Sequence, residues 1–269
     1  MIELPTERRP IQQYNPKLIV LYGRPKCGKS TLMAALDDNL IIDLEDGYKS
    51  LSVMAVQARS AADMFEIQKA LLEKGTKERK VPYNFITIDN ATRLEEMALS
   101  YAAHLYRTTT QMGQNWGMLR DPKDPSKLYK DEKGQLVPDP KADVRLLPQG
   151  GGYLYLRKAV KELVDMFKPY CNTLILVAHV KDKQIRKESE EMNEMSVDLA
   201  GKLGDIICGE ADAIGYVYRS GKNTLISFEG GDSTIKEARP LHLRGKKFIV
   251  ATSDENNNIK VDMSKIFIK

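Results

Sequence analysis

The residues with the clearest chemical meaning follow one another near the amino terminus: Gly23, Arg24, Pro25, Lys26, Cys27, Gly28, Lys29, Ser30 and Thr31. The first eight have the spacing G-x-x-x-x-G-K-S, which is the pattern of a loop that wraps around phosphate groups. Its glycines let backbone N–H groups converge on phosphate oxygens. In this pattern Lys29 reaches the β- and γ-phosphates, and the Ser30 hydroxyl binds Mg²⁺. The segment therefore predicts a nucleotide-binding site, in which Cys27 serves as a small loop residue.

A second chemical group, Asp89, follows the apolar segment Asn84–Ile88, which has the composition of a buried strand. Beside a phosphate loop, a carboxylate at such a strand end orients a Mg²⁺-bound water. An Asp in this place also commonly begins a turn. Because the phosphate loop lies upstream, we predict that Ser30 and Asp89 hold the metal between them.

The elements that must position these groups alternate between apolar strands and amphipathic helices. Strands are predicted at 17–22, 40–44, 84–88 and 173–178, and helices at 31–36, from Ser60 onward, at 94–105 and at 156–167. Apolar strands that alternate with helices are typical of an α/β fold with a mostly parallel sheet covered on both faces. Strands at 211–218, 223–228 and 247–251 predict a β-rich C-terminal extension.

The pattern along the chain predicts one domain over 17–251, preceded by an N-terminal arm over 1–16 and followed by a C-terminal tail over 252–269. Two stretches without periodicity interrupt the domain. One is a proline-containing insertion at about 108–152, and the other is a polar loop at about 181–201. Long irregular segments are uncommon in compact domains and are often functional.

Composition limits the class of protein. A hydrophobic content of 42% supports a sizeable core, and a net charge of +4 neither requires nor excludes a nucleic-acid partner. Three cysteines without a CxxC pattern and three histidines do not suggest a structural zinc site, and His104 and His242 are expected to be structural. Apolar runs too short for a membrane span, and an N-terminus without a signal-peptide core, predict a soluble cytoplasmic protein.

Three further segments resemble RecA-type ATPases. NLIIDLED at 39–46 resembles the strand that ends in Asp-x-Glu in that family, NFITIDNATRL at 84–94 resembles its Walker B strand, and LILVAHVKD at 174–182 resembles the next strand. The resemblance implies a RecA-like P-loop fold that binds ATP and Mg²⁺. It makes Glu45 the residue that activates the attacking water and His179 the sensor of the γ-phosphate, a position where many family members have glutamine.

Within this family, the chain most resembles phage-encoded RecA-like nucleotide-binding proteins, some of which assist single-strand annealing. The segments DLAGKLGD at 198–205 and ADAIGYVYR at 211–219, and a basic R-G-K, contribute to the resemblance, which spans roughly 17–250. It implies single-stranded DNA as a partner, a homo-oligomer in the form of a filament or ring, and a single-strand-binding protein as a candidate partner. It also implies the cytoplasm of a bacterial host.

In RecA-type filaments, the segments after the Walker B helix and after the sensor strand face the DNA, and here these are 108–152 and 181–201. The first carries Arg120, Lys123, Lys127, Lys130 and Lys133, with Trp116 and Tyr129 among them, and Arg107 lies directly before it. Cations and aromatic rings are what single-strand binding uses. Acidic residues are interleaved with these cations, and the second segment is rich in Glu, so solvated loops are the alternative.

A basic cluster near the C-terminus comprises Arg239, Arg244, Lys246 and Lys247. RecA-type proteins place cations from one subunit against the γ-phosphate of its neighbour, where they stabilise transition-state charge. The resemblance makes Arg244 or Lys246 the candidate for this role. A surface patch without function is an equally good interpretation of any one of these residues.

These observations favour a Mg²⁺-dependent, DNA-stimulated ATPase that acts on single-stranded DNA in recombination, annealing or replication. One alternative is a DNA-annealing or mediator protein in which ATP switches assembly with little turnover. A small-molecule kinase is a weaker alternative, because no lid motif with paired arginines is recognisable. A hexameric helicase motor is another, although no accessory domain is visible.

Overall fold

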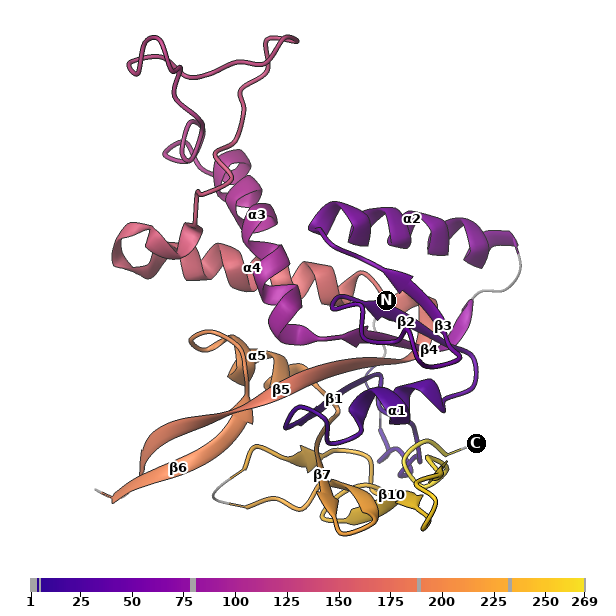
Figure 1. The fold of residues 1–269 in the computed structure, drawn as a ribbon. Coiled ribbons are helices and arrows are strands. Elements are labelled where there is room, and N and C mark those ends of the chain that lie inside the picture. Colours follow the sequence, from indigo (N-terminus) through magenta and orange to yellow (C-terminus); the bar gives the residue numbers. More distant parts are fainter. Residues whose placement is uncertain (1–3, 5, 78–80, 188–189, 232–233, 269) are drawn as a thin grey trace.

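The computed structural model describes residues 4, 6–77, 81–187, 190–231 and 234–268. One twisted sheet crosses the molecule, with helices on both faces (Figure 1). Its parallel part consists of β7 (Ala213–Ser220), β1 (Leu18–Gly23), β5 (Cys171–Lys187), β4 (Tyr83–Asp89), β2 (Asn39–Asp43) and β3 (Met54–Gln57), in that spatial order. Strands β8 (Asn223–Ser227), β10 (Lys247–Ser253) and β11 (Ile259–Val261) extend it antiparallel beyond β7. A short strand, β9 (Glu237–Ala238), also pairs with β7.

The apolar strands form because both of their faces are covered. In β1, Leu18, Val20 and Tyr22 face one core cluster, whereas Ile19 and Leu21 face the other. Successive side chains of a strand point to opposite faces, so a strand buried on both faces has a continuous apolar sequence. The first cluster is closed by four helices: α2 (Ala61–Lys77), α3 (Ala91–Thr109), α4 (Gly151–Asp165) and α5 (Leu203–Glu210). The second is closed by α1 (Lys29–Ala34) and the C-terminal strands.

Local signals place the helices as predicted. Ser60 Oγ accepts a hydrogen bond from the Asp63 N–H (3.2 Å), and the Asp63 carboxylate accepts one from the Ser60 N–H (3.0 Å), which completes the capping box of α2. Asn90 caps α3 by accepting from the Arg93 N–H at 2.9 Å. The predicted α/β class, with a mostly parallel sheet and a β-rich C-terminal extension, is confirmed.

The predicted polar loop at 181–201 is wrong over most of its length. Strand β5 continues to Lys187 and pairs antiparallel with β6 (Glu190–Val197), which makes a long hairpin that leaves the body of the sheet (Figure 1). The sequence at 181–196 is mostly polar and has no apolar period-two pattern, so these strands were not recognised. Strand β3 and helix α5 were not predicted either.

Residues 110–150, which we call the insertion, connect α3 to α4 and project from the body of the molecule (Figure 1). As predicted, the insertion has little regular structure: two short 3₁₀ turns, Val144–Leu146 and Pro148–Gly150, and three isolated β-bridges. Its backbone is nevertheless paired: the Leu119 N–H donates to the Val137 carbonyl, and the Tyr129 N–H to the Leu119 carbonyl, both at 2.9 Å. The insertion is therefore an arm whose backbone is internally hydrogen-bonded.

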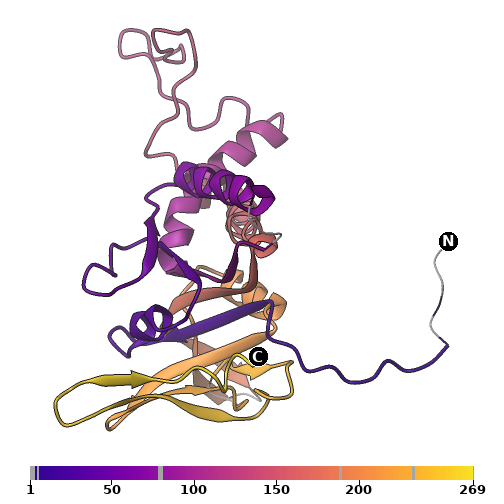
Figure 2. The same cartoon turned by 90° about the vertical axis from the view of Figure 1, so that its right-hand side faces the viewer.

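The two ends of the described chain differ. Residues 6–14 are exposed, and they extend away from the body (Figure 2). At the other end Ile266 and Phe267 are buried beside α1 and the C-terminal strands, and the Asn15 side chain bonds both the N–H and the carbonyl of Ile268. None of the helices in the described ranges is long and apolar enough to span a bilayer.

Candidate active site

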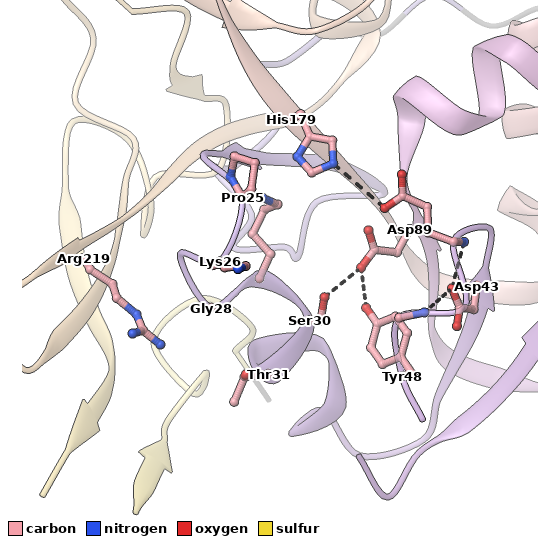
Figure 3. Close-up of a pocket in the computed structure, with 13 residues that line it drawn as sticks. Pro25, Lys26, Gly28, Ser30, Thr31, Asp43, Tyr48, Asp89, His179 and Arg219 are labelled. Atoms are coloured by element: carbon pink, nitrogen blue, oxygen red, sulfur yellow. Dashed lines mark hydrogen bonds and ion pairs between the residues drawn. The ribbon is translucent and has the colours of Figure 1, made fainter. Parts of the chain in front are cut away.

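The carboxyl ends of β1, β4 and β2 lie along one edge of the sheet, beside the middle of the longer strand β5. Gly23 pairs in register with His179 of β5, and Asp43 with Asp89, so four neighbouring strands bring their polar residues to one place. A pocket of about 300 Å³ opens there (Figure 3). It is lined by Pro25, Lys26, Gly28, Lys29, Ser30, Thr31, Asp43, Glu45, Gly47, Tyr48, Asp89, His179 and Arg219. Ligands of open parallel sheets commonly bind outside the carboxyl ends of the strands.

The phosphate loop has the geometry that its glycines predict. A Cβ atom on Gly23 would lie 2.2 Å from the Val217 carbonyl oxygen, so a side chain there would collide with the neighbouring strand. Gly28 has φ of +105°, which residues with a side chain rarely adopt. Six of the nine predicted nucleotide residues line the pocket; Gly23, Arg24 and Cys27 do not.

Lys29 is a buried cation at the base of the loop, with 7% of its surface exposed. Its Nζ donates to the carbonyl oxygens of Gly23 (2.8 Å) and Arg24 (3.0 Å). Burying an ammonium group is costly unless negative charge accompanies it. The loop is thus suited to an anion such as a phosphate. Burial raises the pKa of the neighbouring Cys27 thiol, which keeps it protonated and fits its predicted role as a small loop residue.

Ser30 and Asp89 are brought together as predicted, with 3.2 Å between Ser30 Oγ and Asp89 Oδ2. Burial raises the pKa of the Asp89 carboxyl, while hydrogen bonds from Tyr48 and Ser30 and the charge of Lys29 oppose the increase. A hydroxyl and a carboxylate are hard oxygen ligands, and Mg²⁺ usually takes one or two protein ligands together with phosphate oxygens and water. The pair therefore fits this ion.

Glu45 lies on the turn that follows β2, and Asp43 shapes that turn. Asp43 Oδ1 accepts from the backbone N–H groups of Glu45 (3.0 Å) and Gly47 (3.2 Å). The Glu45 side chain is half exposed, and its Oε2 lies 4.0 Å from His179 Nε2. The two residues predicted to act on water and on the γ-phosphate are thus neighbours in the pocket.

The orientation of His179 follows from Asn90. The Arg93 N–H can only donate, so Asn90 presents Oδ1 to it and its amide nitrogen lies toward His179, 3.0 Å from Nε2. In the neutral ring, Nε2 accepts this hydrogen bond and Nδ1 carries the proton. Nδ1 is buried without a hydrogen-bond partner among the described residues. Protonation of Nε2 would instead make His179 an ion-pair partner of Glu45.

Four pocket residues were given no role by the sequence analysis: Asp43, Gly47, Tyr48 and Arg219. Tyr48 donates its hydroxyl hydrogen to Asp89 Oδ2 at 2.6 Å, and Arg219 lines the pocket from β7, on the far side of Gly28 (Figure 3). Arg219 ends the segment ADAIGYVYR, which offered the resemblance but no role for this residue. A lone tyrosine in a turn gives no spacing signal.

The predicted trans-acting cations lie outside this pocket. Arg244 is exposed, and its guanidinium donates to the backbone carbonyls of Ala238 (3.2 Å) and Arg239 (3.0 Å). Lys246 is exposed and donates to the His242 carbonyl at 3.3 Å. Contact with a nucleotide would therefore require a neighbouring subunit.

The chain is similar to the family described as AAA domain over residues 15–122, a range that includes the phosphate loop, Glu45 and Asp89. No curated protein matches it. Among solved structures, the RadB recombinase is 10% identical and aligns over 93% of this chain and 92% of its own, with a TM-score of 0.45. A prototypical ATPase from the type III secretion system of pathogenic bacteria is 13% identical and aligns over 75% of this chain and 51% of its own, with a TM-score of 0.38.

Proposed function

We propose that this protein binds ATP with Mg²⁺, hydrolyses it, and acts on single-stranded DNA in recombination, annealing or replication. The observation that carries the proposal is the grouping of Lys29, Ser30, Asp89 and Glu45 in one pocket at the carboxyl edge of the sheet. A buried cation, a metal-ligating pair and a separate carboxylate are the parts that phosphoryl transfer to water requires. The match to the AAA domain family over this region supports the same conclusion.

Each residue has a distinct role in this proposal. The Lys29 ammonium exchanges its loop carbonyls for phosphate oxygens, and Ser30 and Asp89 hold the Mg²⁺, which neutralises charge on the phosphates. Glu45 orients a water molecule and takes its proton as the water oxygen bonds to the γ-phosphorus and the bond to the ADP oxygen breaks. His179 is the proposed sensor of the γ-phosphate, from its position beside Glu45 in the pocket.

The insertion supports the DNA part of the proposal. Arg120, Lys123, Lys130 and Lys133 are exposed along the projecting arm, as is the ring of Tyr129. Trp116 does not belong to this set: it is half-buried and packs edge-on against Tyr106 of α3, with ring centroids 5.5 Å apart. Because its ring packs at the base of the insertion, we leave Trp116 out of the proposed DNA-contact surface.

The proposal is tested by measuring ATP hydrolysis with and without single-stranded DNA, for the unaltered chain and for the Lys29→Ala and Glu45→Gln variants. We expect single-stranded DNA to accelerate hydrolysis by the unaltered chain. Each of the two substitutions should abolish this DNA-stimulated hydrolysis. Tight ATP binding without DNA-dependent turnover would instead favour a DNA-annealing protein in which ATP acts as a switch. In that case strand annealing should persist in Glu45→Gln.

Assembly is the remaining element of the proposal. If Arg244 completes the site of a neighbour in a filament or ring, Arg244→Ala and Glu45→Gln subunits should each be inactive alone. A mixture should recover part of the activity, because some sites would then combine an intact Glu45 with an intact Arg244 from the next subunit. No recovery on mixing would exclude Arg244, and the Lys246→Ala mixture tests the other cation.

A further inference from the structure

Tyr48 joins an apolar core to the polar site. The residue is 4% exposed and belongs to the core cluster that contains Leu32 and Met33 of α1. Its hydroxyl reaches the pocket and donates to Asp89 Oδ2 at 2.6 Å. A ring that is packed within a core has little freedom to swing, so the hydroxyl is presented at a fixed point beside the predicted metal ligands.

The bond from Tyr48 determines how the Asp89 carboxylate is presented. Oδ2 accepts from both Tyr48 and Ser30, at 2.6 and 3.2 Å. Hydrogen bonds to an ionised carboxylate are stronger than those between neutral groups, and they favour the charged form. Tyr48 therefore orients the Asp89 carboxylate.

Tyr48 also belongs to the turn that carries Glu45. This turn is attached to the end of β4 at two points: the Leu44 N–H donates to the Asp89 carbonyl at 2.8 Å, and the Tyr48 hydroxyl bonds the Asp89 side chain. The second attachment lies three residues beyond Glu45. Any change in the position of the carboxylate is thus transmitted to the turn on which the water-activating residue sits.

We propose that Tyr48 is a positioning residue, whose hydroxyl holds the Asp89 carboxylate and the Glu45 turn in the arrangement that Mg²⁺-nucleotide binding requires. This inference rests on the proposed function and deepens it. It assigns to one hydroxyl group the coupling between the metal ligand and the turn that bears the base. Tyr48 does not touch the nucleotide in this scheme, and it acts through Asp89.

The test is the affinity for a fluorescent ATP analogue, measured in excess EDTA and over a series of Mg²⁺ concentrations. Tyr48→Phe keeps the ring and removes the hydroxyl. We expect the affinity in EDTA to be unchanged, and the Mg²⁺ concentration at half-saturation to rise about tenfold, which corresponds to about 1.4 kcal/mol. Turnover should fall as well. These results separate metal positioning from a general loss of the site.

Tyr101→Phe is the matched control, because the Tyr101 hydroxyl also donates to a carboxylate, Glu162 Oε2 at 2.7 Å, away from the pocket. It should leave the Mg²⁺ dependence unchanged. A double-mutant cycle provides the second variant: in an Asp89→Asn background, Tyr48→Phe should have no further effect on metal dependence. A role confined to packing would give additive effects instead.

The outcomes separate the two proposals. Equal Mg²⁺ dependence in Tyr48→Phe and the unaltered chain, with nucleotide binding intact, would overturn the role of Tyr48 alone. Absence of nucleotide binding by the unaltered chain would overturn the proposed function, and the role of Tyr48 with it. Should phenylalanine prevent folding, fluorotyrosine at position 48 retains the shape and makes the hydroxyl a stronger donor, so the half-saturating Mg²⁺ concentration should change.

Discussion

The carboxyl edge of the sheet and the insertion hold the two groups of functional candidates, and they are built in opposite ways. At the edge, side chains from distant segments bond to one another, as Asp89 does with Ser30 and Tyr48. In the insertion, carboxylates bond to their own backbone: Asp131 Oδ1 accepts from the N–H groups of Lys133 (2.9 Å) and Gln135 (2.8 Å). Tertiary structure fixes the first region, whereas local turns fix the second.

This difference explains the alternation of Lys and Asp in the insertion. Asp121, Asp131 and Asp139 each accept from the N–H two residues later, at 2.8 to 2.9 Å. Such turns use a short acidic side chain as a structural part. The acidic residues thus shape the arm, and the lysines that follow them remain at its surface. An almost neutral composition is therefore compatible with a cation-bearing outer face.

The largest difference between the regions is expected for Lys29→Ala. Removing the buried ammonium should reduce ATP hydrolysis by about 10²–10³-fold, as loss of one preorganised donor does in other active sites. Glu45→Gln should reduce turnover to a similar extent while ATP affinity is retained, because Glu45 acts on water. Changes in the insertion should leave DNA-independent hydrolysis intact. A substantial loss of the DNA-independent hydrolysis rate in Lys130→Ala would show that the insertion also affects the nucleotide site.

A smaller effect is expected from Arg219, which lines the pocket from β7 with its Nη2 4.0 Å from the position a Cβ on Gly28 would take. Its charge should stabilise a bound triphosphate, so Arg219→Ala should raise the Kd for ATP about five- to tenfold. Lys222→Ala removes an exposed cation from the neighbouring turn and is the control for net charge. If both variants bind ATP alike, Arg219 has no specific role.

In the insertion we expect graded effects on DNA and none on the nucleotide. Tyr129→Ala should weaken single-stranded DNA binding by about 1–3 kcal/mol if the exposed ring stacks on a base. Lys130→Ala should lower the salt dependence of binding by about one unit of slope if that cation contacts a phosphate. Lys260→Ala, an exposed change on β11, is the control. If Tyr129→Ala and Lys130→Ala both leave the DNA affinity and its salt dependence unchanged, the insertion is not part of the DNA-binding surface.

The same contrast shows what the sequence can and cannot predict. Ser30 and Asp89 were predictable, because one belongs to a spaced motif and the other ends an apolar strand, and strand ends share an edge. The bond of Tyr48 depends on the path of a turn that Asp43 holds, and no periodicity encodes it. The β5–β6 hairpin was missed because its strands are polar. The apolar pattern of the sequence thus predicts the sheet and the helices that cover it. Side-chain contacts made by turns can be found only in the structure.

The smallest effect concerns stability and pH. Burial raises the pKa of Asp89 above its ordinary value of 3.8, so at neutral pH the ionised carboxylate costs the folded state free energy that the unfolded chain does not incur. Asp89→Asn keeps an oxygen that accepts from Tyr48 but removes the charge. In the absence of nucleotide it should raise the melting temperature at pH 7 by on the order of 1–3 °C.

The sign of the pH dependence follows from the direction of the pKa shift. As the pH falls from neutral through the raised pKa of Asp89, the carboxylate of the folded protein takes up a proton, and the cost of burying its charge disappears. The advantage of Asp89→Asn should therefore shrink between pH 7 and pH values near 4, when the two proteins are melted side by side. Metal binding should respond in the opposite sense, because the protonated acid is a poor Mg²⁺ ligand. A constant difference in melting temperature across this range would mean that Asp89 is not charged in the folded protein at pH 7. The carboxyl edge of the sheet would then be less suited to a cation than its contacts indicate.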